Sequence, residues 1–208
     1  IYEIQILRDS QYFCILPFIG LCLEPTNLIV TEYMSNGSLK SRLESKINPL
    51  DGSKKTIIAL GTAYALQFLH SMRYIHRDLK PDNILLDSND YPILSDFGIS
   101  RLLPDDPNQF MSNVGTVQYL APEIFADGRY DNKVDVYSYG ITLWSLLTSE
   151  KPFRGVKQFQ VLARVQSGKR PVIPTSCPPS LKKLIESCWD QDAKKRPTFD
   201  EIVASFES

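Results

Sequence analysis

The chain has 208 residues, of which 43% are hydrophobic and 23% are charged, as in an ordinary globular protein of one large domain or two small ones. Its formal net charge of −1 gives no reason to expect binding to nucleic acid or to an anionic membrane. No uncharged run reaches the ~20 residues that a membrane-spanning helix needs, so no membrane segment is expected.

The cysteines show no C-x-x-C spacing, and we interpret all four as free thiols: Cys14, Cys22, Cys177 and Cys188. This spacing argues against a zinc site. Free thiols are typical of a reducing cytosol, so a cytoplasmic location is expected. No signal peptide is visible, and the chain begins with isoleucine rather than methionine.

The first elements predicted are a short helix and two strands. Apolar residues recur at helical spacing between 1 and 9. Two apolar runs, 14–23 and 28–33, are separated by a Pro-Thr-Asn turn signal and fit two antiparallel strands. After an Asn-Gly break, Ser38 can cap a short helix that reaches about Glu44.

The next helix leads into the most informative stretch of the sequence. Residues 56–71 are apolar on more than one side of a helix, which predicts a buried helix. Residues 74–83 follow, with the sequence Tyr-Ile-His-Arg-Asp-Leu-Lys-Pro-Asp-Asn, and match the pattern H-R-D-L-x-x-x-N. A basic surface turn after a helix is the alternative interpretation.

Two further motifs follow at defined distances. An apolar hairpin pattern, 84–86 and 91–94, precedes Asp-Phe-Gly at 96–98. A polar segment then runs to Ala-Pro-Glu at 121–123. Loops of this length without their own periodicity are usually functional. The hydroxyl-bearing residues considered in this segment are Ser100, Ser112, Thr116 and Tyr119.

The last third of the chain predicts helices only. Residues 133–148 form a second largely apolar helix pattern, and shorter patterns cover 158–165 and 181–189. The sequence Arg-Pro-Thr-Phe at 196–199 opens the last helix.

The three motifs in this order and spacing are a specific signal, and the chain resembles a eukaryotic protein kinase over its whole length. The resemblance implies an α+β fold and a single kinase domain over residues 1–208. Residues 1–34 would form a remnant of the small lobe, with the end of the helix called αC, two strands and the hinge. Residues 35–208 would form a mainly helical large lobe. The implied activity is phosphoryl transfer from ATP to protein substrates with Mg²⁺ as cofactor.

The resemblance also implies the site. Asp78 would accept the proton of the attacking hydroxyl, and Lys80 would face the charge on the transferred phosphoryl group. Asn83 and Asp96 would bind the metal through hard oxygen ligands. The nucleotide would contact these groups and also the residues that line the rest of its site: Thr31 as gatekeeper, the backbone of Glu32 and Met34 in the hinge, and Leu85. A simple strand end is the alternative for the hinge residues.

Several other residues receive supporting roles from the resemblance. His76 would pack beneath Phe97, and Asp135 would hydrogen-bond the backbone of the catalytic loop. A helix-start carboxylate is the alternative for Asp135, and both roles can hold at once. Arg196 would pair with Glu123.

Two implied roles concern control of the site. Glu3 matches the glutamate that pairs with a lysine in αC, with an exposed helix charge as the alternative. Arg77 would pair with a phosphate on the loop before Gly115, and Ser112 is the best placed hydroxyl. A solvated loop serine is the alternative for Ser112.

Two family features are missing from the sequence. It contains no G-x-G, and its first lysine is Lys40, beyond the hinge. The glycine-rich loop and the strand lysine would belong to strands before Ile1, so we expect a fragment or truncated product of a kinase domain. Without them, residues 1–208 are not expected to transfer phosphate at a useful rate.

The motifs also indicate the acceptor. Lys80-Pro81 is the serine/threonine pattern, whereas Cys188-Trp189 and the segments 170–174 and 196–199 look like the large-lobe ending of tyrosine kinases. The combination resembles the tyrosine-kinase-like group of serine/threonine kinases. A small-molecule kinase would lack the Ala-Pro-Glu segment, and a catalytically inactive scaffold is the main alternative. The substrate, activator and oligomeric state stay open.

Overall fold

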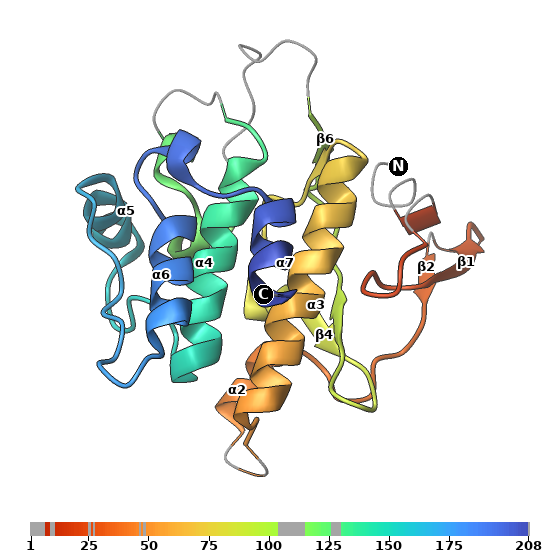
Figure 1. Cartoon of the computed structure of the whole chain (residues 1–208). Coiled ribbons are helices and arrows are strands. Elements are labelled where there is room, and N and C mark those ends of the chain that lie inside the picture. Colours follow the sequence, from red (N-terminus) through yellow and green to blue (C-terminus); the bar gives the residue numbers. More distant parts are fainter. Residues whose placement is uncertain are drawn as a thin grey trace.

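The structure is a computed structural model that describes residues 7–8, 11–24, 26, 28–45, 47, 49–103, 115–125 and 130–207. These residues form an α+β fold in which a two-stranded hairpin lies beside a larger, mainly helical body (Figure 1). The α+β class is the one that the sequence predicted. None of the helices within these ranges is long and apolar enough to cross a membrane.

The hairpin is shorter than the apolar runs that predicted it. β1 (Phe18–Cys22) pairs antiparallel with β2 (Leu28–Thr31). The predicted first strand began at Cys14, but the residues before Pro17 bind the helical body instead. The N–H of Leu94 donates to the Cys14 carbonyl at 2.7 Å, and the N–H of Leu16 donates to the Leu94 carbonyl at 2.9 Å. Burial of this segment against the body therefore takes these residues out of the hairpin.

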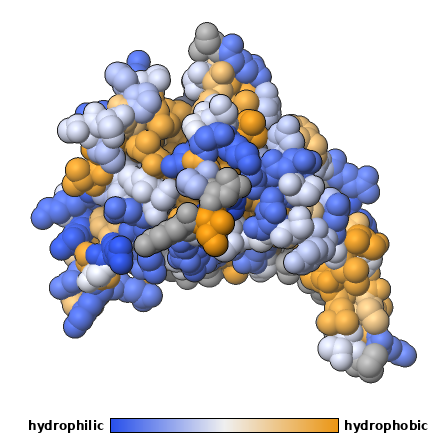
Figure 2. Space-filling view, turned by 90° about the horizontal axis from the view of Figure 1, so that it is seen from below, coloured by the Kyte–Doolittle hydropathy of each residue, from blue (hydrophilic) through white to orange (hydrophobic). Residues whose placement is uncertain are grey.

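The hairpin carries apolar side chains on its surface. In Figure 2 these side chains gather on the arm at the lower right, on the side where Figure 1 places β1 and β2. They are Ile19, Leu21, Leu23, Leu28, Ile29 and Val30, all exposed.

The first two helices begin at side-chain caps. α2 (Leu39–Glu44) starts after Ser38, whose hydroxyl accepts a hydrogen bond from the first turn, as predicted. α3 (Gly52–Ser71) starts four residues before the predicted Thr56, because Asp51 caps it in the same way. The apolar pattern alone did not reveal this start, since the first turn of α3 is polar.

α4 (Lys133–Thr148) has the predicted bounds and forms the centre of the body, where it lies between α6 and α3 (Figure 1). Thirteen of its sixteen residues are buried, which explains why the apolar residues of α4 are not confined to a single face of the helix. Gly140 allows α6 to approach, because a Cβ there would lie 2.8 Å from the Cβ of Cys188. The remaining helices lie close to their predicted ranges: α5 (Gln158–Gln166), α6 (Pro179–Cys188) and α7 (Phe199–Glu207).

Short strands and turns support the loops between α3 and α4. β3 (Tyr74–Ile75) pairs with β6 (Arg101–Leu102), and β4 (Ile84–Leu86) pairs with β5 (Pro92–Leu94), the predicted hairpin. Four short 3₁₀ turns complete the described elements: η1 (Pro81–Asn83), η2 (Val117–Tyr119), η3 (Pro122–Phe125) and η4 (Ala193–Lys195). These pairings place residues 76–83 and 95–100 side by side.

A buried ion pair joins η3 to the segment before α7, as predicted. The fully buried guanidinium of Arg196 donates two parallel hydrogen bonds to the carboxylate of Glu123, at 2.6 and 2.9 Å. It also donates to the carbonyls of Asp190 and Lys133, and lies 5.1 Å from the centre of the Tyr137 ring. One arginine thus fixes three segments of the body.

We expect Arg196→Met to lower the free energy of unfolding by about 3–5 kcal/mol, because it leaves the Glu123 carboxylate without its partner in a mostly buried position. Denaturant titration measures the change. Lys182→Met is the control, since it removes only an exposed contact of 3.9 Å to Glu186 and should leave stability unchanged within error. Equal losses for the two variants would contradict the role of Arg196.

Candidate catalytic site

Asp135, at the start of α4, holds the loop that begins at His76. Its buried carboxylate accepts hydrogen bonds from the backbone N–H groups of His76 and Arg77, both at 2.8 Å. It accepts a third from Nε2 of His70 at 2.9 Å. Arg77 has a φ of 68°, an uncommon value for a residue with a side chain. The two backbone bonds thus hold a strained turn in place.

Burial alone would raise the pKa of Asp135. The hydrogen bond and electrostatic effect of His70, followed by the electrostatic effect of His76 and its backbone N–H, outweigh burial, so the pKa lies below its ordinary value. Nδ1 of His70 lies 3.3 Å from the side-chain amide of Asn132, which orients the ring from its other side. His70 therefore has a structural role, since both of its ring nitrogens contact side chains near the start of α4.

We expect Asp135→Asn to destabilise the fold by about 1.5–3 kcal/mol at neutral pH, the range for a hydrogen bond to a charged group. The folded pKa of Asp135 lies below that of the unfolded chain, about 3.9, so the ionised carboxylate stabilises the fold above that pH. This contribution disappears as the pH falls through the folded pKa. Denaturant titrations should therefore show a difference between the two proteins that is constant above pH ~5 and shrinks below pH ~4. A difference that grows in acid would contradict this assignment.

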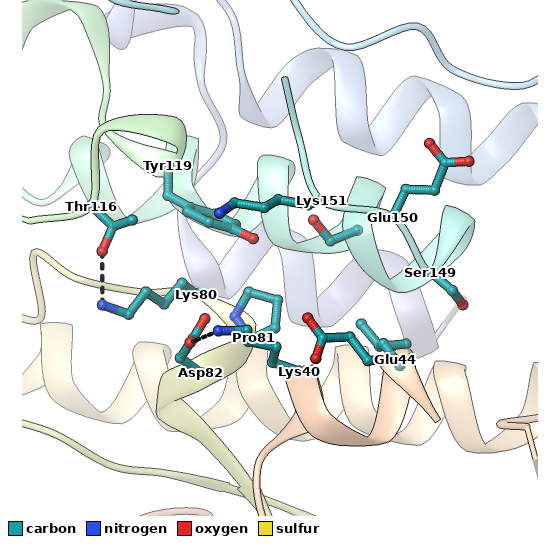
Figure 3. Close-up of a pocket in the computed structure, with 12 residues that line it drawn as sticks. Lys40, Glu44, Lys80, Pro81, Asp82, Thr116, Tyr119, Ser149, Glu150 and Lys151 are labelled. Atoms are coloured by element: carbon teal, nitrogen blue, oxygen red, sulfur yellow. Dashed lines mark hydrogen bonds and ion pairs between the residues drawn. The ribbon is translucent and has the colours of Figure 1, made fainter. Parts of the chain in front are cut away.

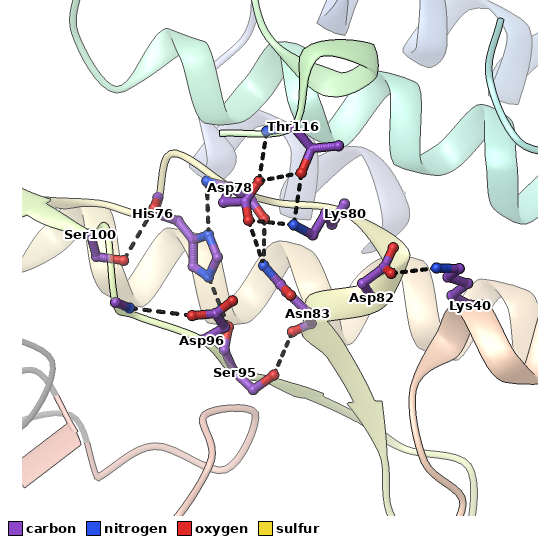
Figure 4. A network of polar contacts seen from close by, with 11 residues as sticks. Lys40, His76, Asp78, Lys80, Asp82, Asn83, Ser95, Asp96, Ser100 and Thr116 are labelled. Atoms are coloured by element: carbon purple, nitrogen blue, oxygen red, sulfur yellow. Dashed lines mark hydrogen bonds and ion pairs between the residues drawn. The ribbon is translucent and has the colours of Figure 1, made fainter. Parts of the chain in front are cut away.

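His76 connects the two loops of the site (Figure 4). Its Nε2 donates to the carbonyl of Ser95 at 3.1 Å, and its Nδ1 accepts from the backbone N–H of Asp78 at 3.3 Å. Because a carbonyl only accepts and an N–H only donates, these bonds fix the tautomer with the proton on Nε2. The ring lies edge-on to Phe97 at 5.4 Å, which confirms the predicted packing.

The carboxylate of Asp78 is the centre of a polar cluster (Figure 4). Lys80 Nζ donates to one carboxylate oxygen of Asp78 and to Thr116 Oγ1, the latter at 2.7 Å. Thr116 donates its hydroxyl and its backbone N–H to the other oxygen, at 2.9 and 3.0 Å. The side-chain amide of Asn83 donates at 3.1 Å. The structure thus brings Thr116 into contact with both Asp78 and Lys80.

A glycine allows the loop of Thr116 to come this close. Gly115 has a φ of 113°, a conformation that side chains rarely adopt. A Cβ at this position would lie 2.7 Å from the carbonyl oxygen of Arg77 and 2.6 Å from Leu120. Only glycine therefore fits between the two loops.

Asn83 and Asp96 are suited to share a metal ion. The side-chain nitrogen of Asn83 donates to Asp78, which leaves the side-chain oxygen of Asn83 as the atom for a cation. The hydroxyl and the backbone N–H of Ser95 both donate to the backbone carbonyl of Asn83. Asp96 is exposed, with a φ of 61°. The part of the chain that the structure describes contains no cluster of three or more His, Cys, Asp or Glu that could hold a metal. Two protein ligands suit Mg²⁺, which commonly keeps water and phosphate oxygens as its other ligands.

The predicted hinge leaves two backbone groups available. The N–H of Glu32 donates to the Pro17 carbonyl at 3.0 Å, and the Met34 carbonyl accepts from the N–H of Gly37 at 3.2 Å. Within the described ranges, the carbonyl of Glu32 and the N–H of Met34 have no hydrogen-bond partner. Thr31, at the end of β2, is half-buried. The hinge thus presents one acceptor and one donor two residues apart.

The segment after the hinge is fixed by a cluster that the sequence did not reveal. The buried carboxylate of Asp90 accepts from Lys54 Nζ and from the side-chain amide of Asn36 at 3.0 Å, and Arg42 lies at 3.5 Å. The hydrogen bond from Lys54 lowers the pKa of Asp90. Nearby, the N–H of Leu86 donates to the Gly37 carbonyl at 2.8 Å, which fixes the hinge beside the strand of Leu85. Asp90 lies 36 to 54 positions after its three partners in the sequence, and no local pattern links it to them.

A hollow of about 210 Å³ opens next to Lys80 and Thr116 (Figure 3). Asp82 and Lys40 form an ion pair of 2.7 Å on one side, and Tyr119 lies opposite. Glu150 and Lys151, from the segment after α4, close its far end. A polypeptide could therefore approach the Asp78 cluster from this side.

Two predicted control residues, Glu3 and Ser112, lie outside the described residues. Arg77 is buried, and its Nε donates to the Ile99 carbonyl at 2.6 Å. One of its terminal nitrogens lies 3.4 Å from the hydroxyl of Tyr130. Pairing of Arg77 with a phosphate stays a prediction.

The fold and its loops have the arrangement of a protein-kinase-like fold, as the motifs predicted. Comparison with known proteins agrees. Residues 1–206 match the family model described as protein tyrosine and serine/threonine kinase. The chain belongs to this family.

Three similar proteins illustrate the family. The chain is 41% identical to the serine/threonine/tyrosine-protein kinase HT1 of Arabidopsis thaliana, over 99% of this chain and 53% of that protein. It is 36% identical to the probable serine/threonine-protein kinase drkD of Dictyostelium discoideum, over 99% of this chain and 16% of that protein. It is 37% identical to the putative serine/threonine-protein kinase/receptor R831 of Acanthamoeba polyphaga mimivirus, over 97% of this chain and 12% of that protein. The chain thus spans between 12% and 53% of the length of these relatives.

Proposed function

We propose that the chain carries the catalytic part of a kinase that transfers the terminal phosphoryl group of ATP to serine or threonine hydroxyls of proteins. The observation that carries this proposal is the Asp78 cluster, in which Lys80, Thr116 and Asn83 all donate to one carboxylate. Two of the three relatives above are named serine/threonine kinases and the third a serine/threonine/tyrosine kinase, which supports serine and threonine as acceptors.

Each group of the cluster has a chemical task in this proposal. Asp78 accepts the proton of the acceptor hydroxyl as the hydroxyl oxygen bonds to the terminal phosphorus of ATP and the bond from that phosphorus to the bridging oxygen breaks, releasing ADP. Lys80 already bridges Asp78 and Thr116, so its charge lies where an entering phosphoryl group gains negative charge. Thr116 positions the carboxylate through two bonds to a single oxygen.

The nucleotide site follows from the other groups. Asn83 and Asp96 would hold Mg²⁺, which neutralises phosphate charge. The carbonyl of Glu32 and the N–H of Met34 offer an adenine edge one acceptor and one donor. Thr31 and Leu85 would limit the size of the ring that fits there. A cytoplasmic signalling role is part of the proposal, and the four free cysteines support its cytoplasmic location.

We expect Asp78→Asn to lower turnover by about 10²–10⁴-fold, because a positioned base contributes a factor of that size. The KM for ATP should change little. Asp96→Asn should instead raise the KM for ATP and the Mg²⁺ requirement, because it removes a metal ligand. Steady-state kinetics in the gene product that carries this chain measures both. Equal turnover of the parent protein and Asp78→Asn would refute the role of Asp78 and favour an inactive scaffold.

The acceptor is tested with a degenerate peptide library containing serine, threonine and tyrosine. The same gene product should yield phosphoserine and phosphothreonine, because Lys80 and Thr116 crowd the approach to Asp78 and favour a short hydroxyl side chain. The products are identified by phosphoamino-acid analysis. Predominant phosphotyrosine would overturn the assignment.

A further inference from the structure

The charges of the chain are strongly segregated, which the net charge of −1 conceals. Residues 151–185 contain eight of the 23 lysines and arginines and none of the 24 aspartates and glutamates. This acid-free segment includes the loop after α4, the whole of α5 and the loop that leads to α6. The rest of the chain is correspondingly acidic.

The acid-free segment folds around an open hollow of about 700 Å³. Five cationic side chains line it: Lys151, Arg154, Arg164, Lys169 and Arg170. Glu150 is the single acidic residue in its lining as far as the structure describes the chain. The electrostatic potential in the hollow is therefore positive, and concave walls strengthen it.

Four of the five cations are free to meet a ligand. Among the residues that the structure describes, the side chains of Lys151, Arg154, Arg164 and Lys169 have no ion-pair or hydrogen-bond partner. All four are exposed. Unpaired charges of one sign repel each other, and an anionic partner relieves that repulsion.

The wall behind these charges is rigid. Arg170 donates to the carbonyls of Trp189 and Val165, at 3.0 and 3.1 Å, and lies 4.9 Å from the centre of the Tyr137 ring. The indole N–H of Trp144 donates to the Val172 carbonyl at 2.8 Å. The hollow is thus preformed, which lowers the entropy cost of binding.

The hollow also offers apolar contact. Val172 has 84% of its surface exposed, and Phe153 is half-buried in the lining. A membrane surface would need projecting cations, whereas these cations surround a concavity. A nucleic acid would supply phosphates but no aliphatic group for Val172. An acidic peptide with one apolar side chain supplies both.

We propose that this basic hollow docks an acidic segment of a protein partner, with an apolar side chain of the segment packed against Val172 and Phe153. The hollow shares Glu150 and Lys151 with the smaller hollow beside Lys80 and Thr116 (Figure 3). A partner docked here therefore lies next to the Asp78 cluster. Docking needs neither nucleotide nor phosphoryl transfer, so it stands apart from the proposed activity.

Fluorescence anisotropy tests the proposal with the 208-residue chain and a labelled twelve-residue peptide of glutamates around a central leucine. We expect binding that weakens at least about tenfold between 50 and 300 mM NaCl, because exposed charges are screened by salt. Replacing every glutamate by glutamine should abolish binding. Replacing the leucine by serine should weaken it about threefold to tenfold, the value of a small apolar contact.

Matched variants assign the site. Arg154→Glu with Arg164→Glu should reduce affinity at least about tenfold, because two free cations become anions in the hollow. Lys194→Glu with Lys195→Glu, on exposed residues outside the acid-free segment, makes the same change in net charge and should leave affinity within about twofold of the parent. Thermal melts show whether each variant is folded.

The other occupants are outcomes of the same experiment. Equal losses in both variant pairs, or no binding of the acidic peptide, would overturn the proposal. It would also be overturned if phosphatidylserine vesicles or single-stranded RNA bound the chain through Arg154 and Arg164 while the acidic peptide did not. Loss of kinase activity in the Asp78→Asn variant has no bearing on these measurements, so the two proposals fail independently.

Discussion

The carboxylate of Asp135 is the constraint on which the candidate site depends. It is buried at the start of α4 and satisfies two consecutive backbone N–H groups, of His76 and Arg77, that have no strand or helix partner of their own. The left-handed backbone at Arg77 then turns the chain so that Asp78 faces Thr116. A rigid central helix thereby positions a loop whose own sequence has no regular structure.

The rest of the site is built outward from that turn. His76 joins the loop to the Asp-Phe-Gly segment through its two ring nitrogens, and Asn83 joins it to the same segment through its backbone carbonyl. Proton acceptance, on Asp78, and metal binding, at Asn83 and Asp96, would therefore be positioned by one connected network. A small shift of α4 would be transmitted to both functions.

Much of this arrangement was predictable from the sequence because its motifs are local. The residues of 74–83 and 96–98 predicted the cluster of Asp78, Lys80 and Asn83, and the apolar pattern predicted α4 to the residue. Long-range polar contacts were not predictable without the resemblance. The Asp90 cluster joins residues up to 54 positions apart, and nothing in the sequence around Asp90 distinguishes it from a turn aspartate. The start of α3 at its Asp51 cap was missed for a different reason, since a polar first turn carries no apolar pattern.

Hydrogen exchange of individual backbone amides tests the central claim most directly. The N–H groups of His76 and Arg77 lie in a loop, yet both are bonded to the buried carboxylate of Asp135. The account predicts that they exchange as slowly as the amides in the middle of α4 and become fast in Asp135→Ala, while the amides of α6 stay slow. Fast exchange of both amides in the parent protein, at the rate of an exposed loop, would contradict it.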